Sequence, residues 1–156
     1  MSSQSLSLVA PLVRALGFLQ MIEESLRLYV GTAEELVEAA VPYGVRFRVD
    51  KNAIENASLE KLTNMFFKVN RNDELIARLR QLPKHRNYIA HAAFMRAMQA
   101  TTDKGIDVEF AKKHAAEVGD EAEKILGVIA QEMKSLLANF PNSKSAALTF
   151  NIFSDD

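Results

Sequence analysis

Residues 107–140 read DVEFAKKHAAEVGDEAEKILGVIAQEMKSLLANF. Asp107 is a good helix cap, the apolar residues after it recur every three or four positions, and Pro141 stops the pattern. The apolar positions are Val108, Ala111, Ala115, Val118, Ala122, Ile125, Ile129, Met133, Leu136 and Phe140. As a helix, residues 107–139 would span about 50 Å at 1.5 Å per residue. This stretch therefore predicts a long amphipathic helix that needs a partner of similar length.

The first part of the chain supplies that partner. Between Leu12 and Val41 the apolar residues again follow helical spacing, with acidic residues mostly between them, and Pro42 ends the pattern. The repeating positions are Leu12, Leu16, Leu19, Leu26, Val30, Ala33, Val37 and Val41. We expect the two long helices to pack side by side.

Shorter helices are expected between them. Ser58 and Asn72 can each cap a helix, and Pro83 kinks or restarts the second of these. Beyond that proline, residues 84–98 contain no strong helix breaker. The fold class is thus an all-α, up-and-down bundle of four to five helices.

Two segments depart from the helical pattern. Apolar residues alternate with other residues in 45–49 and again in 148–152, as in β-strands. Isolated strands need a partner, so the two could form a minor two-stranded β element, within one chain or between two copies. No linker divides the chain, which is predicted to be one domain over 1–156 with a tail, 141–156, that can form a strand.

Composition excludes several classes of protein. The 156 residues include 19 Lys and Arg against 20 Asp and Glu, so the chain is no polycation that coats nucleic acid. It has no Cys, no long apolar run and no apparent signal peptide, which leads us to expect a cytoplasmic protein without disulfides or membrane contact. Three His and no Cys argue against a zinc site, and no Glu-x-x-His segment is present for a di-metal centre. We therefore expect no metal and no cofactor.

Residues 82–92, LPKHRNYIAHA, stand apart chemically. Residues 71–86 include five Lys or Arg residues and only two acidic residues, which makes this segment a local basic patch in a chain of net charge −1. On a helix Asn87 and His91 share a face one turn apart, with Arg86 next to Asn87. A neutral His can take the proton of a ribose 2′-hydroxyl, and Arg can bind the phosphate. The pattern predicts metal-independent cleavage of RNA by Arg86, Asn87 and His91.

The same patch suggests further RNA contacts. Besides the catalytic candidates, the predicted RNA-binding residues are Arg78, Arg80, Lys84 and His85. Because Arg86 and His91 lie on different edges of the helix, one copy gives a sparse site. Two copies facing each other across a dimer axis would give a fuller one.

Arg86-Asn87-Tyr88-Ile89-Ala90-His91 resembles the Arg, polar residue, three others, His signature of the HEPN superfamily. The order of helices over Leu6 to Phe140 is also similar to the HEPN up-and-down bundle. The resemblance implies a homodimer with the motif helices at the interface. In active members it implies a metal-independent endoribonuclease, often in toxin–antitoxin or phage-defence systems, with an antitoxin or regulatory protein as a further partner.

One position departs from a branch of the family. Where the branch paired with a nucleotidyltransferase antitoxin has a modified Tyr two positions after the His, this chain has Ala93. The superfamily also contains members that cut nothing, so the alternative is a regulatory or interaction module that binds a nucleotide or a protein partner.

The simplest interpretation of the motif remains open beside these. Arg86 and His91 could be an ordinary surface or interface pair satisfied by Glu23 or Glu24 of the first helix. Glu23 could equally face Arg27 at i,i+4, or orient the Arg86 side chain.

Overall fold

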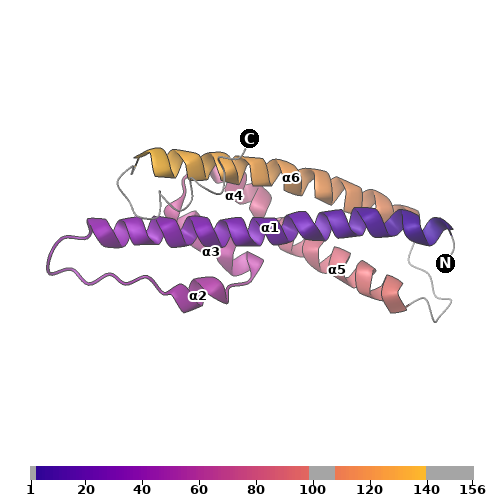
Figure 1. The fold of residues 1–156 in the computed structure, drawn as a ribbon, viewed down its shortest axis with the longest axis horizontal. Coiled ribbons are helices and arrows are strands. Elements are labelled where there is room, and N and C mark those ends of the chain that lie inside the picture. The colour runs from indigo at the N-terminus through magenta and orange to yellow at the C-terminus, as the bar shows by residue number, and fades with distance from the viewer. Residues whose placement is uncertain (1–2, 99–107, 140–156) are drawn as a thin grey trace.

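Long helices dominate the architecture. The computed structural model describes residues 3–98 and 108–139, in the order α1 Ser3–Ala40, α2 Lys51–Glu55, α3 Leu59–Val69, α4 Asp73–Leu79, α5 Leu82–Met98 and α6 Val108–Asn139. α1 runs the length of the molecule, with α6 along one side and α3 and α5 along the other (Figure 1). The predicted all-α bundle is confirmed, as is the pairing of the two long helices.

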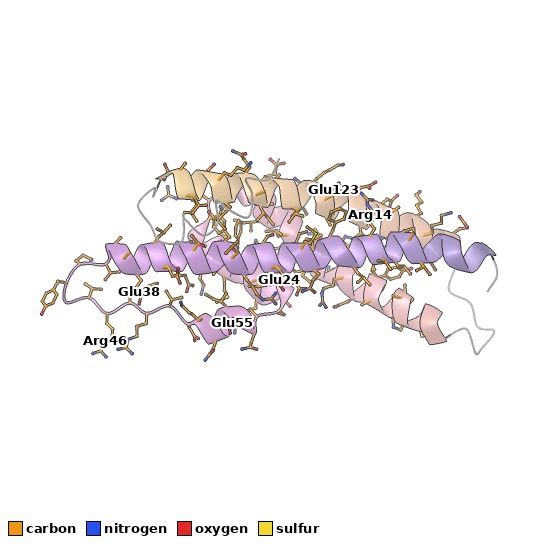
Figure 2. The ribbon with its side chains drawn as sticks, viewed as in Figure 1. Arg14, Glu24, Glu38, Arg46, Glu55 and Glu123 are labelled. Atoms are coloured by element: carbon orange, nitrogen blue, oxygen red, sulfur yellow. The ribbon has the colours of Figure 1, made fainter. Side chains whose placement is uncertain are left out.

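α1 and α6 run parallel. Near their N-terminal ends, Arg14 on α1 pairs with Asp120 and Glu123 on α6 (Figure 2). Near their C-terminal ends, Leu36 and Leu136 line a common pocket. α5 runs in the opposite direction, so its C-terminal end lies towards the start of α1 (Figure 1).

The apolar rows of α1 and α6 form the core, and most of the predicted positions are buried. Val37 is 45% exposed and Leu136 only partly buried, because the neighbouring Leu36 and Leu137 face the core instead. Buried on α1 are Leu8, Leu12, Ala15, Leu19, Ile22, Leu26, Tyr29, Val30, Ala33 and Leu36, and on α6 Ala111, Ala115, Val118, Ala122, Ile125, Ile129, Met133 and Leu137. Phe66 on α3 is fully buried, with its ring 4.8 Å from that of Tyr29. This burial of apolar surface is the main source of stability.

The predicted residues cap the N-termini of α3 and α4. The Ser58 hydroxyl accepts a hydrogen bond from the backbone N–H of Lys61, and Asn72 Oδ1 accepts one from Leu75. Asp50 caps α2 in the same way, a helix that the sequence analysis did not predict. Pro83 lies in the first turn of α5, where a missing N–H costs no hydrogen bond.

The predicted strand at 45–49 does not form. Residues 45–50 have no regular secondary structure, and Val45 is 62% exposed. Arg46 points away from the helices (Figure 2). The segment predicted as its partner, 148–152, lies outside the described residues, as do the predicted cap Asp107 and the whole tail, 141–156.

A partly buried polar network joins the α3–α4 turn to both long helices. The Asn70 amide donates to the Tyr29 hydroxyl at 2.8 Å and to Glu132 at 2.9 Å, and the Asn72 amide donates to Glu132 at 2.7 Å. Burial raises the pKa of Tyr29, partly offset by its hydrogen bond with Asn70, and the charge of Glu132 raises it further. The network fixes the chain entering α4 and thereby the start of α5.

Candidate functional site

α5 carries the whole motif and is held in one rotation by its apolar residues. Leu82, Ile89 and Ala92 are each at most 3% exposed, so they face the core. With those positions inside, Asn87 and His91 face outward, and both are exposed. The sequence spacing therefore placed these two side chains correctly on one exposed face of a helix.

Arg86 turns towards α1. Its Nε lies 2.7 Å from Oε1 of Glu23, a residue only 5% exposed. The other carboxylate oxygen of Glu23 lies 3.6 Å from Arg27, one helical turn away. The sequence left open whether Glu23 contacts Arg27 or Arg86. In the structure it contacts both.

Glu24 takes a different role. Its carboxylate accepts hydrogen bonds from Arg27 at 2.8 Å and from Gln20 at 3.0 Å, and its side chain is 62% exposed. Arg27 also donates to the Ala57 carbonyl at 3.0 Å. The arrangement encloses Glu23 between two guanidinium groups and leaves Glu24 at the surface.

A pocket lies beside the exposed face of α5. It measures about 400 Å³ and is lined by Glu60, Thr63, Asn64, Arg80, Pro83, Lys84 and Asn87. Lys84, Asn87 and His91 are all exposed and occupy positions i, i+3 and i+7 of the helix. We call these three residues the α5 stripe. It combines a cation, an amide and an imidazole along one edge of the bundle.

The predicted RNA-binding residues do not share one surface. Arg80 and Lys84 line the pocket, and the Arg80 guanidinium lies 5.2 Å from the centre of the Phe67 ring. Arg78 instead forms a 2.7 Å ion pair with Glu121 on α6. His85 also turns towards α6, so the structure brings only Arg80 and Lys84 together with Asn87.

His85 belongs to an aromatic cluster between α5 and α6. Its Nδ1 lies 3.4 Å from Nε2 of His114, whose ring contacts Tyr88 edge-on and stacks on Phe110. Burial lowers the pKa of His85, and the neighbouring His114 and Lys84 lower it further. In the sequence, the four-residue spacing of Phe110 and His114 could have indicated that the two rings share a face of one helix. That spacing does not indicate which residues of α5 lie against them.

The buried carboxylate of Glu23 should matter to folding. We expect Glu23→Ala to lower the free energy of unfolding by about 1–3 kcal/mol, because two guanidinium groups lose their buried partner. Glu24→Ala should cost less than about 1 kcal/mol, because exposed ion pairs contribute little. Urea denaturation of both variants measures the difference, and equal losses would contradict the distinction between the two carboxylates.

Other kinds of site are limited in the described chain. In residues 3–98 and 108–139, no group of three or more His, Asp or Glu side chains is placed to hold a metal ion. Among the helices of that same part, none has the length and apolar character needed to cross a bilayer.

Comparison of the chain with protein-family models, with curated proteins and with solved structures finds no match. The resemblance to HEPN domains therefore depends on the motif and on the helices around it.

Proposed function

We propose that the chain is a HEPN-like domain that cleaves RNA without a metal ion, at a site assembled from two copies of α5. The observation that carries the proposal is the exposure of Asn87 and His91 on one face, next to an Arg86 anchored by a buried carboxylate. A catalytic imidazole must reach its substrate, and a phosphate-binding guanidinium must be held in place.

The chemistry follows from these groups. A neutral His91 accepts the proton of a ribose 2′-hydroxyl, and the 2′-oxygen then forms a bond to the adjacent phosphorus. The bond to the 5′-oxygen breaks, and that oxygen receives a proton from the His91 imidazolium of the second copy. The products are a 2′,3′-cyclic phosphate and a 5′-hydroxyl end. Arg86 binds the phosphate charge, and Asn87 positions the groups.

A second copy of the chain supplies what one copy lacks. General acid and general base work in the same step need two imidazoles in different protonation states. One chain offers a single His on the α5 stripe, since His85 turns towards α6. Symmetric association through the α5 stripe would bring two His91 side chains to a shared cleft.

One observation favours the alternative, a non-catalytic module. The charge of Arg86 is already met by Glu23 at 2.7 Å, so less of it is available for a phosphate. In that case Arg80 and Lys84 at the pocket would bind a nucleotide or an acidic segment of a protein partner.

Cleavage of labelled RNA in EDTA tests the proposal. We expect the native chain to cut RNA and to leave cyclic phosphate ends, and to spare a matched strand with 2′-deoxyribose at the cut positions. Arg86→Ala should lose most of the activity, while Arg46→Ala, which removes an exposed arginine on the 41–50 loop, should retain it. Failure of the native chain to cut a broad RNA panel would overturn catalysis and favour the binding module.

A further inference from the structure

Two of the three histidines of the chain meet across a helix–helix contact. His85 lies on α5 and His114 on α6, 29 residues apart in sequence. Their ring centres are 5.2 Å apart, and the planes are inclined by 48°. Both side chains are partly exposed, so water can reach them.

The separation of the facing nitrogens is compatible with two kinds of contact. Nδ1 of His85 and Nε2 of His114 are 3.4 Å apart, the distance of a long N–H···N hydrogen bond whose donor depends on the tautomer. Imidazole nitrogens bind Zn²⁺ at about 2.0–2.1 Å, and two such ligands at a tetrahedral angle lie about 3.3–3.4 Å apart. The observed distance is compatible with one metal ion bound by both rings.

The surroundings hold the His114 ring in place. Phe110 stacks on His114 with an interplanar angle of 3°, and Tyr88 approaches the same ring edge-on at 4.8 Å. These contacts restrict the His114 ring, so little rotational freedom is lost when a ligand binds.

We propose that His85 and His114 form a binding site for one borderline-soft dication such as Zn²⁺, which clasps α5 to α6. Imidazole nitrogens favour Zn²⁺, Ni²⁺ and Cu²⁺ over Mg²⁺, which prefers oxygen ligands. Two protein ligands leave positions for water, so the affinity is modest and is further reduced by the charge of Lys84. The site acts on the packing of α5 and takes no part in the cleavage step, because His91 lies on the exposed α5 stripe.

Calorimetric titration of the full chain with ZnCl₂ tests the site directly. We expect one Zn²⁺ per chain in the native protein and no binding of Mg²⁺. His85→Gln and His114→Gln should each weaken Zn²⁺ binding at least about tenfold. Even the loss of a residue that only hydrogen-bonds to a ligating histidine lowers metal affinity by roughly 10–100-fold. His91→Gln is the matched control, since it removes the third histidine and should leave the affinity unchanged.

Thermal unfolding provides a second measurement that does not depend on RNA cleavage. Zn²⁺ should raise the unfolding midpoint of the native chain and of His91→Gln, but not that of the other two variants. Absence of binding, or binding lost in His91→Gln and kept in His85→Gln, would overturn the proposal. Sedimentation with and without Zn²⁺ measures whether the ion changes the oligomeric state. Association that depends on Zn²⁺ would mean that the metal bridges two copies, which would contradict an intramolecular clasp.

Discussion

His91→Ala is expected to slow RNA cleavage by about 10²–10⁴-fold, the usual contribution of a positioned general acid or base. His91 is exposed on α5 and lies one turn from Asn87, so its removal should leave the fold intact. Single-turnover cleavage of labelled RNA in EDTA measures the rate, and circular dichroism checks the fold. Gln81→Ala, which shortens an exposed side chain just before α5, is the control and should cut at the native rate.

Two further measurements separate a chemical role of His91 from a merely structural one. Added imidazole should restore part of the activity of His91→Ala, because it can occupy the vacated space and transfer the proton. Mixing native chains with an excess of His91→Ala chains should lower the native rate, because a mixed dimer holds only one of the two imidazoles that the reaction needs. A His91→Ala chain that cuts at the native rate would contradict catalysis at this motif.

Phe66→Ala is expected to lower the free energy of unfolding by about 3–5 kcal/mol, the usual cost of deleting a fully buried aromatic side chain. Phe66 is 0% exposed, and its ring lies 4.8 Å from that of Tyr29. The substitution removes this contact and leaves a cavity between α3 and α1 that rigid helices fill only in part. Urea denaturation followed by circular dichroism measures the loss.

The next residue in the chain provides the matched control. Phe67 is 50% exposed, and its main described contact is with the Arg80 guanidinium. Phe67→Ala should therefore cost about 1 kcal/mol or less, the value of an exposed cation–π contact. Similar losses for both substitutions would mean that Phe67 is covered by a second chain or that Phe66 is less enclosed than the packing indicates.

Much of the fold could be predicted because it depends on local signals. The spacing of apolar residues located α1 and α6, and the caps at Ser58 and Asn72 begin helices where they were expected. The alternation at 45–49 misled because a strand requires a partner, and alternation alone does not provide one. α2 has five residues, too few for helical periodicity, and only its Asp50 cap could have indicated it.

The same distinction between local and long-range features applies to the candidate site. That Asn87 and His91 share an exposed face follows from their spacing within one helix. The contacts Arg86–Glu23, Arg78–Glu121 and His85–His114 depend on how α5 and α4 are rotated against α1 and α6. Such rotations are set by the packing of many side chains together, so sequence could name Glu23 only as one of several partners.

The network of Tyr29, Asn70, Asn72 and Glu132 has a consequence for the uniqueness of the fold. Two long parallel helices with apolar residues every three or four positions can slide past each other by one turn, about 5.4 Å, and still bury apolar surface. Such a slip would carry Glu132 away from both amides and break two hydrogen bonds of partly buried groups, at about 1 kcal/mol for each. We infer that these four side chains set the register of α6 against α1 and exclude packings that hydrophobic burial alone would tolerate.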